Sequence, residues 1–234
     1  MPPDQHLYEF FSSLQQYRAP QVFNPWAQRN ADDQAAHNGP QQRLQRLQAH
    51  LASDVRQLLL GEASGYQGCR ISGVPFTSER LLLAGAIPRL PCPRARLSTR
   101  ERPWSEPSAT TVWSVLQQHG IADSTLLWNA FAWHPFKDGE RLSNRTPGPR
   151  ERAHGLEVLE LLLAAIPHAR LFAVGRHAQQ LLEQLGRAST ALRHPSMGGA
   201  LRFRLELGQA LARQDTAPRR RRRATRRAKA VARN

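Results

Sequence analysis

Apolar positions recur along the chain with two different periods, and these predict alternating strands and helices. Short apolar runs predict four strands, over residues 55–60, 125–131, 169–174 and 190–193. Apolar residues at helical spacing predict the helices between and after them, over residues 77–83, 108–119, 151–165, 178–185 and 201–211. Strands that alternate with helices indicate an α/β fold of three layers, α/β/α, with a central, mostly parallel four-stranded sheet.

The first 50 residues are rich in Gln and predict two further helices. An apolar stripe predicts one helix that starts near Pro3, and a second stripe predicts a helix over 41–51. We expect residues 1–50 to pack as a helical segment on a domain formed by residues 51–213. Residues 88–107 are rich in Pro and Arg and predict a long loop inside that domain.

Charge is concentrated at the C-terminus. The formal net charge is +15, and residues 218–234 contain nine basic residues and no acid, which leaves +6 for residues 1–217. Residues 214–234 therefore have the composition of a disordered polycation that binds phosphate backbones without reading sequence. Arg219, Arg220 and Arg221 are candidate DNA contacts. A solvated tail that only aids solubility is the alternative.

Two further features restrict the class of protein. No apolar run approaches the roughly 18–20 residues that span a bilayer, and the N-terminus lacks the pattern of a secretion signal. We expect a cytoplasmic protein that associates with the nucleoid through DNA and has no membrane partner. Cys69 and Cys92 are too few for a disulfide framework or a four-cysteine metal site, so no metal or other cofactor is expected.

A polar residue stands at or just after the end of three predicted strands. These residues are Glu62, Asn129 and His194. Parallel strands place their carboxyl ends at one edge of the sheet, so the three should meet in one crevice, where open α/β folds bind ligands. Each has an ordinary alternative when read alone: an exposed Glu in a turn, an Asn that caps a strand, and an exposed loop His.

Four short motifs follow one another around these residues. They are Gly-Glu-Ala-Ser-Gly at 61–65, Gly-Val-Pro-Phe at 73–76, Asn129, and His-Pro-Ser at 194–196. In this order they resemble the uracil-DNA glycosylase superfamily over roughly residues 55–207, and most of all its Gly-Glu-Ala-Pro-Gly branch. Ser64 stands where that branch usually has proline, and the four cysteines that hold an iron–sulfur cluster in its best-known members are missing. The resemblance implies a cluster-free relative.

The resemblance also implies roles for the residues. Phe76 would stack on a base flipped out of the DNA, although a core Phe is the alternative. Asn129 would match O4 and N3 of uracil, and His194 would donate a hydrogen bond to the carbonyl oxygen where negative charge develops. Glu62 would stabilise the sugar cation and position the attacking water, since Ala63 stands where other branches carry a water-activating Asp.

Further residues are predicted to contact the substrate or the DNA. Gly61 and Ala63 would line the substrate through their backbone. The predicted DNA contacts lie in two loops, with Met197 as a wedge into the gap left by the base: Ser143, Arg145, Ser196, Met197 and Gly198. Surface residues without such a contact are the alternative.

The function implied by the resemblance is hydrolysis of the N-glycosidic bond of uracil in DNA, the first step of base excision repair. No lysine lies within the motifs, so a monofunctional enzyme without a Schiff-base step is expected, acting as a monomer. Three alternatives stay open. They are a glycosylase for another deaminated base such as hypoxanthine or xanthine, a catalytically silent DNA-binding module that senses lesions, and a hydrolase of free nucleosides or nucleotides.

Overall fold

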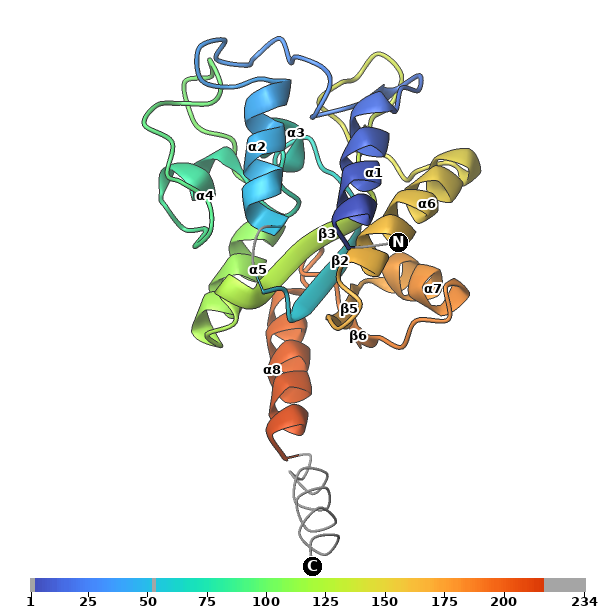
Figure 1. The fold of residues 1–234 in the computed structure, drawn as a ribbon. Coiled ribbons are helices and arrows are strands. Elements are labelled where there is room, and N and C mark those ends of the chain that lie inside the picture. The colour runs from blue at the N-terminus through green and yellow to red at the C-terminus, as the bar shows by residue number, and fades with distance from the viewer. Residues whose placement is uncertain (1–2, 52–53, 217–234) are drawn as a thin grey trace, which may run out of the picture.

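The computed structural model describes residues 3–51 and 54–216, and a four-stranded parallel sheet lies at its centre (Figure 1). The strands are β2 (Gln57–Ala63), β3 (Thr125–Phe131), β5 (Arg170–Val174) and β6 (Thr190–Leu192). Their order across the sheet is β3-β2-β5-β6, and every neighbouring pair is parallel. The predicted α/β fold with a parallel sheet is confirmed.

Helices cover both faces of this sheet (Figure 1). One face packs against α5 (Pro107–Gln118) and α8 (Ala200–Thr216). The other face packs against α1 (Pro3–Gln16), α6 (Pro149–Ala165) and α7 (Arg176–Gln184). The molecule therefore has the three layers that the alternation of strands and helices predicts.

The central strand β2 shows how one apolar run serves both layers. Successive side chains of a strand point to opposite faces of the sheet. Leu59 accordingly belongs to the core beneath α5 and α8, whereas Leu58 and Leu60 belong to the core beneath α1, α6 and α7. All three are fully buried, which explains why this strand reads as a continuous apolar run and not as an alternating one.

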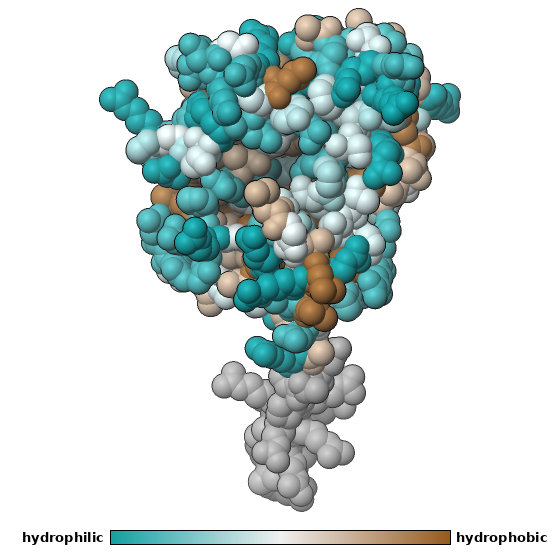
Figure 2. Space-filling view, turned by 180° about the vertical axis from the view of Figure 1, so that it is seen from behind, coloured by the Kyte–Doolittle hydropathy of each residue, from teal (hydrophilic) through white to brown (hydrophobic). Residues whose placement is uncertain are grey.

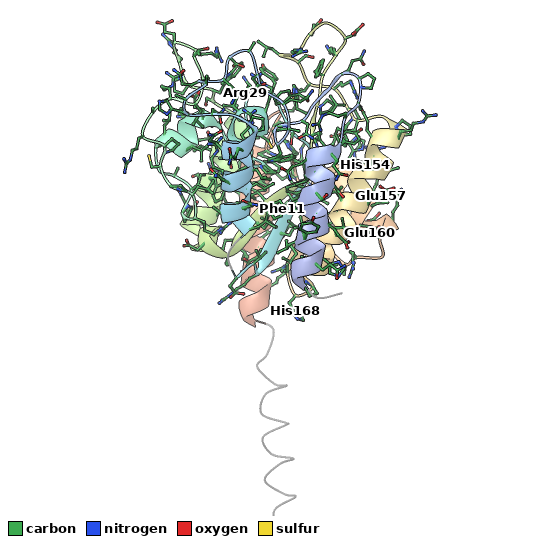
Figure 3. All side chains as sticks on the ribbon, turned by 45° about the horizontal axis from the view of Figure 1, so that its top comes forward. Phe11, Arg29, His154, Glu157, Glu160 and His168 are labelled. Atoms are coloured by element: carbon green, nitrogen blue, oxygen red, sulfur yellow. The ribbon has the colours of Figure 1, made fainter. Side chains whose placement is uncertain are left out.

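The N-terminal helix α1 lies beside α6. Phe10 and Leu14 of the predicted apolar stripe are buried in the core on that side of the sheet. Figure 3 shows Phe11 on α1 next to α6, which carries His154 and Glu157. The last two form an ion pair, with Nδ1 and Oε2 3.1 Å apart. Burial of the stripe accounts for the helical periodicity of the N-terminal segment.

The remaining elements are short, except for α2. They are α2 (Pro40–Leu51), α3 (Cys69–Ser72), α4 (Glu79–Leu83), η1 (Ala122–Ser124), β1 (Val22–Phe23) and β4 (His134–Pro135). Strands β1 and β4 pair with each other in antiparallel direction. This pairing was not predicted, because two residues are too few to show a period. It joins the N-terminal segment to the loop that follows β3.

The long loop between α4 and α5 is held by one buried carboxylate, that of Glu79. It accepts hydrogen bonds from the backbone N–H groups of Leu97, Ser98 and Trp104, at 2.9, 3.0 and 2.9 Å. The Ser98 hydroxyl and the Arg96 guanidinium also donate to it. Burial alone would raise the pKa of Glu79, but these hydrogen bonds outweigh burial and lower it. An ionised Glu79 therefore fixes the loop that leads into α5.

The C-terminal boundary differs from the prediction. Helix α8 extends to Thr216, beyond the predicted end at residue 211. The rest of the predicted tail, residues 217–234, lies outside the described residues, and with it Arg219, Arg220 and Arg221. Within residues 3–51 and 54–216, none of the helices has the length and apolar character needed to cross a membrane.

Candidate active site

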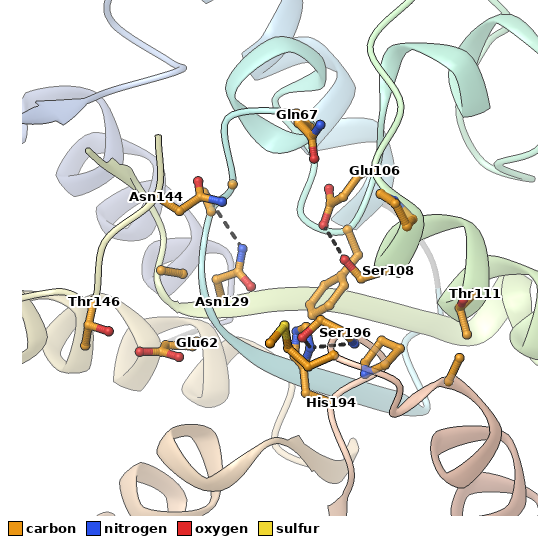
Figure 4. Close-up of a pocket in the computed structure, with 18 of the residues that line it drawn as sticks. Glu62, Gln67, Glu106, Ser108, Thr111, Asn129, Asn144, Thr146, His194 and Ser196 are labelled. Atoms are coloured by element: carbon orange, nitrogen blue, oxygen red, sulfur yellow. Dashed lines mark hydrogen bonds between the residues drawn. The ribbon is translucent and has the colours of Figure 1, made fainter. Parts of the chain in front are cut away.

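A cavity of about 860 Å³ opens at the carboxyl edge of the sheet (Figure 4). It is lined by the segments after β2 and β6, by Asn129 of β3, by Phe76, by the start of α5 and by residues 144–146. The other predicted site residues in its lining are Glu62, Ala63, Arg145, His194, Ser196, Met197 and Gly198. The structure thus brings the three predicted strand-end residues together. Figure 2 shows that the face seen from behind Figure 1 is mostly hydrophilic and hollowed near its centre.

The predicted strand ends need a small correction. Glu62 lies inside β2 and not in the turn after it, whereas Asn129 lies inside β3 as predicted. The ladder between the two strands extends to the pairs Gly61–Asn129 and Ala63–Phe131, so it includes both residues. Each side chain is therefore placed by a strand and not by a loop, which gives it a more rigid support.

Gly61 provides space for two other side chains. A Cβ on Gly61 would lie 2.5 Å from Cζ of Phe76 and 2.6 Å from Oδ1 of Asn129. Only glycine allows the ring and the amide to approach this strand so closely. Gly61 itself is buried behind them, so its contribution is to the shape of the cavity.

Phe76 is held in an unusual backbone conformation. Its φ angle is 49°, in the left-handed region that side chains rarely adopt. Its carbonyl oxygen accepts a hydrogen bond of 2.9 Å from the indole N–H of Trp113 on α5. The ring lies 6.2 Å from that of His194, measured between centroids. The ring thus forms one wall of the cavity.

Asn129 is almost completely buried, with 3% of its surface exposed. Its Nδ2 donates a hydrogen bond of 3.2 Å to the hydroxyl of Ser64. That hydroxyl in turn donates to the carbonyl oxygen of Ala132, a residue just beyond β3. The amide therefore has a fixed orientation before any ligand enters the cavity.

His194 is held as a neutral ring with a defined tautomer. The backbone N–H of Ser196 donates to its Nδ1 over 3.1 Å, and the Ser196 hydroxyl lies 2.7 Å from the same nitrogen. Burial lowers the pKa of His194, and the nearby Arg193 lowers it further. A neutral ring that accepts at Nδ1 carries its proton on Nε2. His194 can therefore donate one hydrogen bond from Nε2.

Glu62 is less firmly held than Phe76, Asn129 and His194. Its side chain is 38% exposed, and Oε1 lies 3.7 Å from Nε2 of His177 on α7. Within the described part of the chain, Oε1 makes no hydrogen bond. His177 was not predicted as a neighbour. It comes from the first turn of a helix on the far side of β2, and nothing in the local sequence signals this approach.

Sequence reasoning also missed Glu106, a second carboxylate in the cavity lining. It precedes Pro107 at the N-terminus of α5, and Oε1 accepts a hydrogen bond of 3.1 Å from the Ser108 hydroxyl. Burial raises the pKa of Glu106 to about 7, against the opposing effect of Ser108. An acid before Pro-Ser at a predicted helix start was the available signal, but it is read more readily as a helix boundary.

The loop after β6 projects from the rim of the cavity. Met197 is 91% exposed, and both Met197 and Gly198 have positive φ angles, 51° and 75°. Leu201 and Leu205 of α8 are also exposed apolar residues, and they follow Met197 at intervals of four residues. The position of Met197 is compatible with the predicted contact to DNA.

The two predicted phosphate contacts in the loop after β3 already have partners. The guanidinium of Arg145 forms two hydrogen bonds with Glu151 of α6, at 2.6 and 2.7 Å, and donates to the carbonyl of Phe136. The Ser143 hydroxyl donates to the carbonyl of Glu140 over 2.7 Å. Both side chains brace the loop, and a contact of either with a DNA phosphate stays a prediction.

Comparison with known proteins gives two findings. Residues 49–216 match the model of a family described as the uracil DNA glycosylase superfamily. The crystal structure of wild-type SMUG2 from Pedobacter heparinus is similar over 92% of this chain and 99% of that chain, with a TM-score of 0.63. Sequence identity to it is 15%, so this likeness shows the fold alone. No curated protein sequence matches the chain.

Proposed function

This chain belongs to the uracil-DNA glycosylase superfamily, and from that premise we propose that it hydrolyses the N-glycosidic bond of uracil in DNA. Membership supports the broader function of a DNA glycosylase. The narrower proposal is supported mainly by one observation: Phe76, Asn129 and His194 meet around one cavity. Each of them offers the kind of contact that a flipped pyrimidine needs.

Asn129 carries the proposed recognition of the base. Its amide offers one donor and one acceptor, and uracil presents an acceptor at O4 beside a donor at N3. Cytosine presents the opposite order and would leave buried groups without partners. Phe76 would stack on the base and replace part of the stacking that the base gives up when it leaves the helix.

His194 and Glu62 carry the proposed chemistry. When the bond between C1′ and the base nitrogen breaks, its electron pair stays on the base, and His194 donates from Nε2 to a base carbonyl oxygen where the charge develops. The sugar becomes a cation, which the carboxylate of Glu62 stabilises. Glu62 positions a water whose oxygen bonds to C1′, and it accepts the water's proton.

Hypoxanthine is the second candidate base. Its O6 and N1–H present the same order of acceptor and donor as uracil, so Asn129 alone does not separate the two. The cavity volume of about 860 Å³ also has room for a purine. A preference for uracil must then come from the fit between the base and the walls of the cavity.

The test is a panel of single- and double-stranded oligonucleotides of one sequence, each with one uracil, hypoxanthine or xanthine, treated with protein and then with alkali. The proposal predicts cleavage at uracil. The same protein with His194→Ala should be much slower, which assigns the activity to this cavity. Release of hypoxanthine without uracil contradicts the uracil assignment. Salt-sensitive binding without any abasic product indicates a silent DNA-binding module.

A further inference from the structure

Ser64 is the residue at which this chain departs from the motif of its branch, and the structure gives it a specific position. It follows β2 directly and is 2% exposed. Its hydroxyl lies between the side chain of Asn129 and the backbone of Ala132, which are distant from it in the sequence. A dashed line in Figure 4 marks the hydrogen bond that starts at the side-chain nitrogen of Asn129.

The number of protons that these groups can donate determines the direction of each hydrogen bond among them. A serine hydroxyl has one proton to donate and two lone pairs that accept. The carbonyl oxygen of Ala132 can only accept, so the Ser64 proton points toward it. Ser64 can then only accept from Asn129, and the group that faces it must be the amide nitrogen.

The neighbouring thiol does not change this assignment. Cys69 is buried, and burial raises the pKa of its thiol to about 12, while an interaction with Ser64 opposes this shift. A thiol with such a pKa keeps its proton at neutral pH and accepts only weakly. It therefore does not compete with the Ala132 carbonyl for the hydroxyl proton.

The fixed amide nitrogen determines what Asn129 can offer to a base. One of its two N–H bonds points to Ser64, and the other remains for an acceptor in the cavity. Oδ1 then lies on the side of Gly61, where a Cβ would come within 2.6 Å of it. A turn of the amide by 180° would place its oxygen against a hydroxyl that has no proton left to donate. The buried pair would then be two acceptors, which is unfavourable.

We propose that Ser64 is a positioning residue that fixes the donor and acceptor of Asn129, and so makes the cavity select bases with an acceptor beside a donor. Uracil and hypoxanthine have this order, and cytosine has the reverse. The proposal rests on the proposed function, because it assumes that Asn129 contacts the base. Proline has no hydroxyl, so a chain with proline at this position must orient its Asn by other contacts.

The first test is a double-mutant cycle with Ser64→Ala and Asn129→Ala on the base that the full-length protein releases. If Ser64 acts through Asn129, Ser64→Ala lowers the single-turnover rate about tenfold in the parent and has no further effect beside Asn129→Ala. Release of cytosine should rise relative to uracil. Ser124→Ala is the control, since this hydroxyl bonds to Gln57 and lies outside the cavity lining. Equal losses from Ser64→Ala in both backgrounds would overturn the proposal.

A second test does not depend on activity, so it separates this proposal from the proposed function. The side-chain amide of Asn129 is assigned by NMR from the signal that Asn129→Ala removes. In the parent protein one of its protons should exchange slowly with water, because Ser64 holds it. Ser64→Ala should accelerate that exchange and Ser124→Ala should not. Identical exchange in the parent and in Ser64→Ala would overturn the proposal, even if uracil is released.

Discussion

The two ends of the cavity differ in how firmly their side chains are held. At the end proposed to bind the base, here called the base end, Asn129 and Ser64 are buried and joined by a hydrogen bond, and Phe76 is held through its carbonyl. At the end proposed to face the sugar, here called the sugar end, the Glu62 side chain is 38% exposed, and its Oε1 is buried without a hydrogen bond among the described residues, 3.7 Å from Nε2 of His177. The side chains of the base end thus have fixed partners in the free protein, whereas Glu62 at the sugar end is partly exposed and has none within hydrogen-bond distance of Oε1 in the described part of the chain.

This difference suggests that the two ends of the cavity have different roles. Buried groups with fixed partners discriminate strongly, because a wrong ligand leaves them without hydrogen bonds. A carboxylate that must stabilise a cation acts more strongly once water is excluded. We therefore expect the base end to set specificity, and the sugar end to become effective only when DNA covers it.

The largest expected effect is that of Glu62→Gln. A neutral amide neither stabilises the sugar cation nor accepts a proton from water, so the single-turnover rate should fall by roughly 10²–10⁴-fold. Binding of the oligonucleotide and the order of preference among bases should stay the same. Glu157→Gln is the control, since Glu157 lies on the surface of α6. An unchanged rate in Glu62→Gln would remove Glu62 from the mechanism.

At the base end, Gly61→Ala should lower the rate by roughly 100-fold, because it displaces both groups that are proposed to contact the base. Its new Cβ would meet Phe76 at 2.5 Å and Asn129 at 2.6 Å. Gly65→Ala is the matched control in the same motif, since its Cβ would approach Asn144 only to 3.8 Å. Circular dichroism checks that both variants fold. Equal rates for the two variants would contradict the close packing at the base end.

Glu106 allows a test through pH. Its pKa of about 7 in the folded chain lies above the roughly 4.3 of an unfolded Glu, so the folded state binds more protons between these values. Its contribution to stability is therefore full below about pH 4 and is lost as pH rises to about 7. Glu106→Gln removes this loss and should raise Tm at pH 8 relative to the parent, by roughly 2–4 °C for each kcal/mol of stability that the parent has lost. A difference in Tm that does not vary with pH would contradict the burial of Glu106.

The smallest effect on the chemistry is expected from removal of the basic tail. Truncation after Ala217 should weaken DNA binding and make it less dependent on salt. The slope of the logarithm of the binding constant against the logarithm of the salt concentration should become shallower by up to about 0.9 for each phosphate that the tail neutralises in the intact protein. The single-turnover rate at saturating protein should stay unchanged, because the cavity is built from residues before the tail. A fluorescence titration over a range of salt concentrations measures the slope. An unchanged slope would show that the tail does not bind DNA.

The sheet and the meeting of Glu62, Asn129 and His194 could be predicted from the sequence. The strands are short apolar runs of buried residues, and parallel strands share one edge, so the ends of these runs had to converge. The start of β2 at Gln57 and its extension to Ala63 could not be read from hydrophobicity, because Gly61 and Glu62 interrupt the apolar run while the backbone ladder continues.

The polar contacts inside the cavity could not be predicted, because they join segments that are distant in the sequence. The hydroxyl of Ser64 contacts Ala132, and the approach depends on the twist and register of two strands. Glu106 reaches the cavity because Glu79 holds the loop before it through backbone N–H groups. Such contacts leave no period or motif in the sequence.

The most direct test of the proposed active site compares the unmodified chain with Asn129→Ala and Glu62→Gln in single-turnover release of uracil and of cytosine, which present opposite orders of acceptor and donor to Asn129. We predict that the unmodified chain releases uracil, that Asn129→Ala changes the ratio of the two rates, and that Glu62→Gln lowers both rates in the same proportion. No release of uracil by the unmodified chain, or the same ratio in Asn129→Ala as in the parent, would contradict the account.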